Sequence, residues 1–219
     1  MKNYRKVLAA ATALTCLVIS LSAPAQHRET TTMRMAEMSA PRSAFHDAMR
    51  KLWEDHVLWT RMYIVSAAKN LPDKKVVMTR LLANQTQIGN AVKPYYGSAG
   101  GNKLTALLRD HILIAAEVVL AAKANNKRKL TSANRRWFAN ADQIAHFLSN
   151  ANPTNWKYEA IRHHMHDHLN LTTEEAVAYL KGDWNGSIVA YDKVHQQILH
   201  MADALSDGIV AQFPDKFRT

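Results

Sequence analysis

Three aspartate–histidine dipeptides recur along this chain at nearly equal spacing. They are Asp55-His56, Asp110-His111 and Asp167-His168, and they lie 55 and 57 residues apart. A second polar residue follows each dipeptide about half a period later: Asn84, Asn140 and His195. A pattern that returns three times at a fixed period indicates a repeated structure in which each copy presents the same pair of polar side chains.

Histidine at these positions has the chemistry of a metal ligand. If the rings converge inside the fold, they form a three- or four-nitrogen site for a transition metal, with Zn or Cu ahead of Fe. The predicted metal ligands are His56, His111, His168, His195 and His164. The neighbouring carboxylates and carboxamides would orient the rings or bind a small ligand, and they are Asp55, Asp110, Asp167, Asn84 and Asn140.

The same residues have two other uses. Each histidine can donate to the Asn or Asp of its own repeat, which would fix the register of the helices without any ligand. A buried His–Asp pair can also act as a general base in a hydrolase or transferase. The chain offers no Gly-x-Ser-x-Gly elbow and no His-Glu-x-x-His motif, and its one cysteine is Cys16. No catalytic residue is therefore nominated.

Apolar residues return in steps of three and four along most of the chain, and no alternating strand pattern occurs. The fold class is therefore all-α. Turn signals at Leu71-Pro72, Asn125-Asn126 and Lys181-Gly182 fall midway between the members of each polar pair, which is the geometry of an antiparallel helical hairpin. A loop is expected over Lys93–Asn102, and a break at Asn152-Pro153. The prediction is a six-helix up-down bundle or short solenoid built from three αα-hairpin repeats, at about 42–96, 103–152 and 154–213.

The first 25 residues have the pattern of a secretory signal peptide. Basic residues precede an apolar run from Val7 to Leu21, and Ala23-Pro-Ala25 has small residues at the cleavage positions. Residues 26–40 are polar without an apolar period, which predicts a disordered linker before a domain at 41–214. We expect a periplasmic or secreted protein with no stable membrane anchor after signal cleavage. Its formal charge of +10 comes from scattered basic residues, so no nucleic-acid partner is expected.

Several short motifs resemble a family of uncharacterised bacterial exported helical-repeat proteins. They are Trp53-Glu-Asp-His-Val-Leu-Trp-Thr-Arg61, the segment from Asn84 to Asn90, Lys93-Pro-Tyr-Tyr-Gly97, Asn140-Ala-Asp-Gln-Ile-Ala145 and Met201-Ala-Asp203. The resemblance covers about residues 50–214 and brings no established site residues. Glycosyltransferase labels occur in that family, but a nucleotide-sugar fold needs strands, which the pattern of this chain does not contain.

These observations favour an exported binding protein that holds a metal ion or a small ligand in the inward His/Asn layer. A ligand-free structural or stress-related helical module is the alternative, and a hydrolase or transferase comes third.

Overall fold

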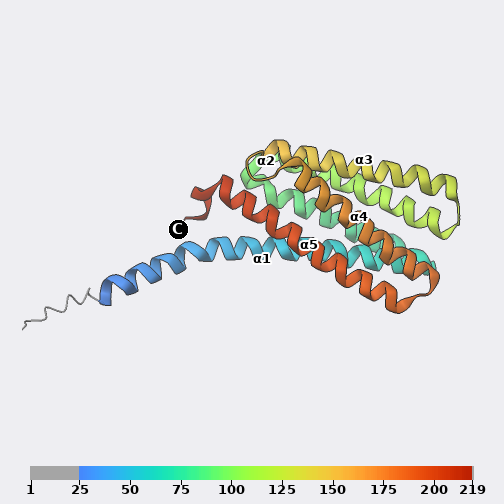
Figure 1. Cartoon of the computed structure of the whole chain (residues 1–219), viewed down its shortest axis with the longest axis horizontal. Coiled ribbons are helices and arrows are strands. Elements are labelled where there is room, and N and C mark those ends of the chain that lie inside the picture. Colours follow the sequence, from blue (N-terminus) through green and yellow to red (C-terminus); the bar gives the residue numbers. More distant parts are fainter. Residues whose placement is uncertain (1–24, 219) are drawn as a thin grey trace, which may run out of the picture. The chain divides into compact units, whose positions relative to one another are not determined.

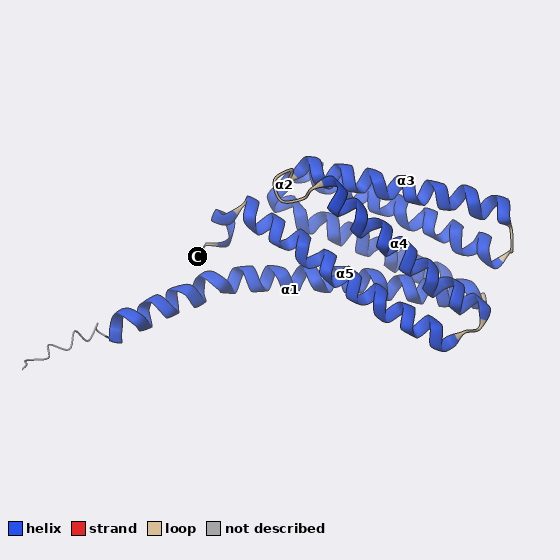
Figure 2. Ribbon diagram, in the orientation of Figure 1, coloured by secondary structure: helices blue, strands red, loops and turns tan. Residues whose placement is uncertain are grey.

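The computed structural model describes residues 25–218, with side chains from residue 40 onward, and every regular element in this range is helical. Figures 1 and 2 show five α-helices followed by one short 3-10 helix. Their bounds are α1 Ala25–Lys69, α2 Lys74–Lys123, α3 Lys127–Ala151, α4 Tyr158–Lys181, α5 Trp184–Gln212 and η1 Pro214–Phe217. The all-α prediction is confirmed, and the helices form a bundle.

Residues 1–36 and 37–219 form two units, and the description below concerns the second. The predicted signal peptide, residues 1–25, lies outside the described residues except for Ala25. The stretch predicted as a linker, residues 26–40, falls within the bounds of α1. None of the helices in the described part combines the length and apolar character needed to cross a bilayer.

Three turns form where the sequence predicts them. Asn70, Asn125 and Gly182 take positive φ values of 53°, 51° and 78°, the left-handed conformation that ends many helices. Backbone bonds then close each turn, for example from Leu71 N to Ser66 O at 2.9 Å. Helix α4 runs without interruption through Thr172 to Lys181, which agrees with a turn midway between His168 and His195.

The loop predicted over Lys93–Asn102 is wrong in its extent, because only Gly97 leaves helical geometry, at φ 71° and ψ 173°, and it joins two helical arms of α2. The chain doubles back at Gly97. Gly89 and Gly101 then lie so close that a Cβ on Gly89 would stand 2.6 Å from the Gly101 carbonyl oxygen. Tertiary packing overrides the Pro and Gly signals here, because Tyr95 packs against an aromatic cluster. Its ring lies 5.2 Å from that of Phe45 and 5.5 Å from that of Phe217.

Neighbouring helices pack as antiparallel pairs, with α2 against α3, α4 against α5 and α3 against α4. A large apolar core runs through the bundle and includes Trp53, Leu108, Ile144, Leu169 and Ile198. A second, smaller core lies toward the α1–α2 turn and includes Ile64, Ala67, Leu81, Ile112 and Ala176. The polar layer described below lies between side chains of these two cores.

Gly97 allows a direct test of this architecture. Replacing Gly97 with Asn is expected to cost about 1–3 kcal/mol of folding free energy, because φ 71° with ψ 173° is open only to glycine. No neighbouring atom lies within 4 Å of a Cβ at this site, so the cost comes from the backbone. Gly182→Asn is the matched control, since its φ 78° and ψ 12° lie in the left-handed region that Asn tolerates. Urea unfolding of both variants measures the difference, and equal stabilities would contradict the assignment.

Candidate functional site

Three of the nominated histidines meet in the interior of the bundle. His56 on α1, His111 on α2 and His168 on α4 are 2%, 2% and 3% exposed. The His168 ring lies near both of the others, with its centroid 5.5 Å from that of His56 and 6.4 Å from that of His111. The repeat pattern therefore identified a real layer of buried imidazoles, which we call the histidine layer.

Two of these rings each form a hydrogen bond through Nδ1 with a side-chain carboxamide. His111 Nδ1 lies 2.8 Å from Asn140 Oδ1, and His56 Nδ1 lies 3.3 Å from Gln85 Oε1. Because a carboxamide oxygen only accepts, Nδ1 of each ring carries the proton and donates it. The second nitrogen of His111 is also engaged, since Trp137 Nε1 donates to His111 Nε2 over 3.2 Å.

Carboxamides beside the layer also tie each histidine helix to its neighbour through the backbone, and Asn140 makes both kinds of bond. For each of the three histidines an amide nitrogen donates to the carbonyl four residues before it. These bonds run from Asn84 Nδ2 to Leu52 O (3.0 Å), from Asn140 Nδ2 to Leu107 O (3.1 Å) and from Gln197 Nε2 to His164 O (2.8 Å). Each bond satisfies a buried amide and fixes the height of one helix against the next.

The partners of the three histidines share one spacing that the sequence argument missed. Gln85, Asn140 and Gln197 each follow their histidine by 29 residues. Beside His56, Asn84 supports Gln85, whose Nε2 lies 3.0 Å from Asn84 Oδ1. Beside His168 the match is incomplete, because His168 Nδ1 and Gln197 Oε1 are both buried and neither has a hydrogen-bond partner.

The prediction that His195 points inward is wrong. Its side chain is 33% exposed, and its Nε2 lies 2.9 Å from Glu54 Oε1 at the surface. The buried positions of α5 before Ile198 are Ser187, Ala190 and Val194, each one residue before the corresponding member of the expected stripe, which begins with Ile188, Tyr191 and His195. A search for carboxamides at constant spacing would have selected Gln197 rather than His195.

His164 does not join the layer either. It lies half-buried in a shallow groove between α4 and α5 that His163, Asp167 and His200 also line. Burial lowers the pKa of His164, and the neighbouring His163 adds to that effect. Its backbone oxygen, not its ring, takes part in the layer.

The dipeptide aspartates do not orient the buried rings, which corrects a second prediction. Asp55 pairs with Lys51 at 3.1 Å and Asp167 with His163 at 3.1 Å, whereas Asp110 is exposed. Successive residues on a helix point about 100° apart, so an aspartate beside an inward histidine faces away from it. No buried His–Asp pair therefore exists in the layer to act as a general base.

Metal ligation by the layer gains no direct geometric support. Among the described residues, no group of three or more His, Cys, Asp or Glu side chains is placed to hold a metal ion. Three of the six ring nitrogens already form hydrogen bonds and are not free to bind a metal. They are Nδ1 of His56, which is protonated, Nδ1 of His111, which is protonated, and His111 Nε2, which accepts from Trp137.

Burial keeps the three imidazoles neutral. It lowers the pKa of His56 to about 3 and that of His111 to about 4, and it lowers the pKa of His168 well below the usual range. The other two rings add to the effect at His168, because a charge on any one ring disfavours a charge on the next.

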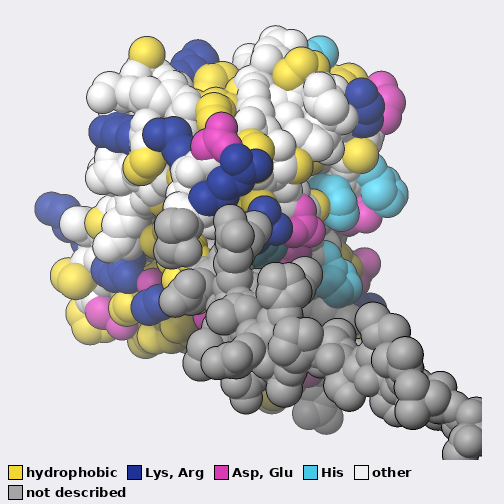
Figure 3. Space-filling model, turned by 90° about the vertical axis from the view of Figure 1, so that its left-hand side faces the viewer, with side chains coloured by type: hydrophobic (Ala, Val, Ile, Leu, Met, Phe, Trp, Pro, Cys, Tyr) yellow, Lys and Arg dark blue, Asp and Glu magenta, His cyan; other side chains and the backbone are white. Residues whose placement is uncertain are grey.

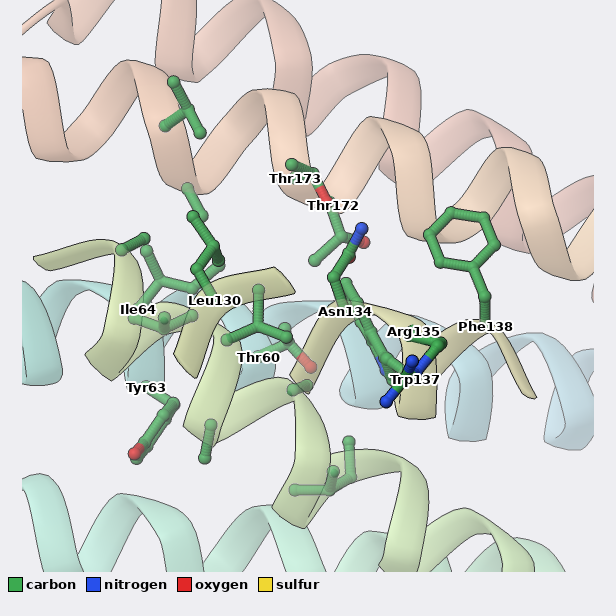
Figure 4. A pocket seen from close by; sticks show the side chains of 18 of the residues that line it. Thr60, Tyr63, Ile64, Leu130, Asn134, Arg135, Trp137, Phe138, Thr172 and Thr173 are labelled. Atoms are coloured by element: carbon green, nitrogen blue, oxygen red, sulfur yellow. The ribbon is translucent and has the colours of Figure 1, made fainter. Parts of the chain in front are cut away.

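A cavity of about 890 Å³ lies beside the layer. Thr60, Ala115 and Thr172 line it, and each follows its histidine by four residues. Figure 4 shows the side chains around this space, with Thr60, Tyr63 and Ile64 from α1, Leu130 to Phe138 from α3, and Thr172 and Thr173 from α4. The cavity thus adjoins the histidine layer, and along α3 and α4 it extends past the height of the layer to Asp142 and Arg162.

The cavity wall is largely apolar. Alanine, valine, leucine, isoleucine and aromatic side chains provide most of it, among them Ile112, Val119, Phe138, Ala176 and Leu180. It opens to solvent along α3, where Thr131, Arg135 and Ala139 line the space and are exposed. The sequence did not predict this cavity. The threonines that follow His56 and His168 by four residues are the one signal that could have indicated it.

Polar groups gather along one part of the cavity. Asp142 Oδ1 accepts from Arg162 Nε at 2.9 Å and lies 2.7 Å from His166 Nε2. Arg135 lines the same cavity, and within residues 40–218 it forms no ion pair. Because Asp142 pairs with Arg162, the charge of Arg135 is the one on the cavity wall that no carboxylate in this range neutralises.

Comparisons with known proteins yield no relatives: no protein-family model, no curated protein and no solved structure matches this chain. The resemblance to exported helical-repeat proteins stays a prediction, and the site must be interpreted from its own geometry.

The buried histidines predict a steep loss of stability in acid. In the folded protein His56 and His111 stay neutral down to about pH 3 and pH 4, and burial lowers the pKa of His168 well below its ordinary value, whereas each ring takes up a proton near pH 6.5 when unfolded. Their contribution is complete above pH 6.5 and falls as the pH drops toward 4, by about 1.4 kcal/mol per pH unit for each histidine. Burial raises the pKa of Glu175 to about 7 against the opposing effect of Arg61. Between about pH 4.5 and 7 the folded state therefore holds one more proton at Glu175 than the unfolded state, and this offsets the pH dependence of one of the three histidines.

Urea unfolding between pH 4.5 and 6.5 measures this dependence. His111→Gln is expected to lower the slope of stability against pH by about 1.4 kcal/mol per unit, whatever it does to absolute stability. His163→Gln, at an exposed histidine on α4, is the matched control and should leave the slope unchanged. Identical slopes for wild type and His111→Gln would show that His111 titrates in the folded state.

Proposed function

We propose that this protein binds a small apolar molecule in the cavity between α3 and α4. The observation that carries the proposal is the volume of about 890 Å³ within a mostly apolar wall. Ligand sites in proteins commonly have volumes of about 300–1,000 Å³, with apolar walls and a few polar groups that fix orientation. A helical bundle that needed only stability would close this space, because an unfilled apolar cavity costs folding free energy.

The polar groups along the wall define the ligand more closely. Thr60 Oγ1 and Thr172 Oγ1 donate to the carbonyls of His56 and His168 at 2.7 Å each, which leaves their lone pairs as acceptors beside the cavity. Arg135 and Arg162 supply positive charge. We infer a ligand with an apolar body and one acidic group, the latter near Arg135.

The histidine layer has a supporting role in this proposal. Its carboxamide bonds fix the relative heights of the helices, and the threonines one turn beyond two of its rings line the cavity. We also propose that the chain consists of three two-helix repeats, with the two arms of α2 belonging to the first and second. The apolar run and cleavage pattern of residues 1–25 support export, so the ligand would be met in the periplasm or outside the cell.

Two fluorescent probes test the cavity. Anilinonaphthalene sulfonate carries an apolar body and one acidic group, whereas N-phenylnaphthylamine has a similar body and no charge. Ala176→Phe, which fills part of the cavity, is expected to weaken both probes at least about tenfold, equivalent to about 1.4 kcal/mol. Arg135→Gln is expected to weaken only the anionic probe.

Ala211→Phe is the matched control, since Ala211 is exposed on α5 and does not line the cavity. Ala139→Trp, at the exposed edge, gives a second obstruction if Ala176→Phe unfolds the protein. If wild type binds neither probe, or if both obstructing variants bind like Ala211→Phe, the cavity is not a ligand site.

A metal ion in the histidine layer is the second candidate. It is favoured by the row of three imidazoles and by His168 Nδ1, which is buried without a hydrogen-bond partner. Small rotations of the rings would be needed, and Zn or Cu fits imidazole nitrogen best.

Metal analysis of protein purified from the periplasm tests this candidate. About one Zn or Cu per chain is expected in wild type and in His163→Gln, and almost none in the double variant His56→Ala/His111→Ala. Near-zero metal in all three proteins would remove the metal from consideration and leave the apolar ligand untouched.

A further inference from the structure

Three of the turns between helices lie together at one end of the 37–219 unit. Lys123 Nζ, at the end of α2, donates to Ala67 O at 2.8 Å and to Asn70 Oδ1 at 2.5 Å. Lys69 Nζ, at the end of α1, lies 4.6 Å from the centroid of the Trp184 ring. These contacts join the α1–α2, α2–α3 and α4–α5 turns, which Figure 1 shows at the right-hand side. We call residues 69–75, 123–129 and 181–184 the turn end.

The turn end is strongly basic. It contains two acidic residues, Asp73 and Asp183, and eight basic ones. The basic residues are Lys69, Lys74, Lys75, Lys123, Lys127, Arg128, Lys129 and Lys181. Its net charge of +6 falls on 18 residues of a chain whose total is +10. Folding thus gathers basic residues that are scattered in the sequence onto one surface.

Exposed apolar side chains gather at the same end. Nine large apolar side chains are exposed in the described range, and six of them belong to the turn end or to the helical turns beside it. They are Leu71, Val76, Leu120, Trp184, Ile188 and Val189. Val76 is 71% exposed and Trp184 48%. Large apolar side chains in water next to a basic surface are typical of proteins that bind the interface of a membrane.

The opposite end has a different character. Figure 3 views the molecule from that side, and its basic side chains are interspersed with acidic and histidine side chains. A soluble polyanion such as a nucleic acid would match the charge of the turn end but not its exposed leucine, valine and tryptophan. An anionic bilayer matches both, because lysines meet the headgroups while tryptophan and aliphatic side chains enter the interface.

We propose that the turn end docks on the surface of a bilayer that contains anionic phospholipid. Trp184, Leu71 and Val76 enter the interface, and the surrounding lysines bind the headgroups. The association is peripheral and reversible, which agrees with the absence of a membrane-crossing helix in the described part of the chain. The inference rests on charge and exposure at this end, and it holds whether or not the cavity binds a ligand.

Flotation with lipid vesicles tests the proposal on the full chain after removal of its first 25 residues. Vesicles of phosphatidylcholine with about one third phosphatidylglycerol are expected to bind the protein at low salt and to release most of it at about 0.5 M NaCl. Phosphatidylcholine alone should bind little. Brominated lipid should quench the fluorescence of Trp184, and this quenching should be lost in Trp184→Phe.

A matched pair of charge variants completes the test. Lys127→Glu/Lys129→Glu changes two exposed turn-end residues and should weaken vesicle binding at least about 25-fold, since each lysine near an anionic surface contributes about fivefold. Lys103→Glu/Lys216→Glu makes the same charge change at exposed positions away from the turn end and should have much less effect. Lack of binding to anionic vesicles at low salt would overturn the proposal, and so would equal losses in the two variants. Binding of a DNA oligonucleotide without vesicle binding would assign the surface to a soluble polyanion and also overturn it.

Discussion

The structure depends on burying three imidazoles without charge. A neutral imidazole still has one donor and one acceptor, and leaving either unpaired in an apolar interior costs about 1–3 kcal/mol. The side-chain oxygens of Gln85 and Asn140 accept hydrogen bonds from the ring Nδ1 atoms. The amide nitrogens of Asn84, Asn140 and Gln197 donate to backbone oxygens on the neighbouring helix. A shift of any of these helices by one residue would break these bonds, so the layer specifies register in a way that an apolar core alone does not.

This constraint also explains the position of the cavity. The layer holds the helices together at one height, and the apolar core on one side of it is closely packed. On the other side, the turn after each histidine carries Thr60, Ala115 or Thr172, all small or medium side chains that leave room between α3 and α4. The bonded layer thus keeps the helices in place beside a space that side chains alone do not fill.

The sequence predicted the helices, three turns and the inward histidines, because each depends on local patterns or on the repeat. It failed where two local signals competed or where packing decided. The Pro and Gly residues of 93–102 predicted a loop, but Tyr95 and its aromatic neighbours keep all except Gly97 helical. His195 was chosen because it continues the spacing of Ile188 and Tyr191, whereas the buried positions at the start of α5 are each one residue earlier. The cavity was not predictable from spacing, because its volume depends on how far α3 and α4 diverge.

The connections between helices have a mechanical consequence. The chain passes from α3 to α4 through residues 152–157, at the end opposite the α2–α3 and α4–α5 turns, and α2 doubles back at Gly97 on that same side. No covalent link joins α3 to α4 beside the cavity. Packing and the bonds of Asp142 on α3 to Arg162 and His166 on α4 hold the two helices together there. The 152–157 segment is itself anchored to α5, because the buried Asn152 Nδ2 donates to Gly208 O at 2.8 Å.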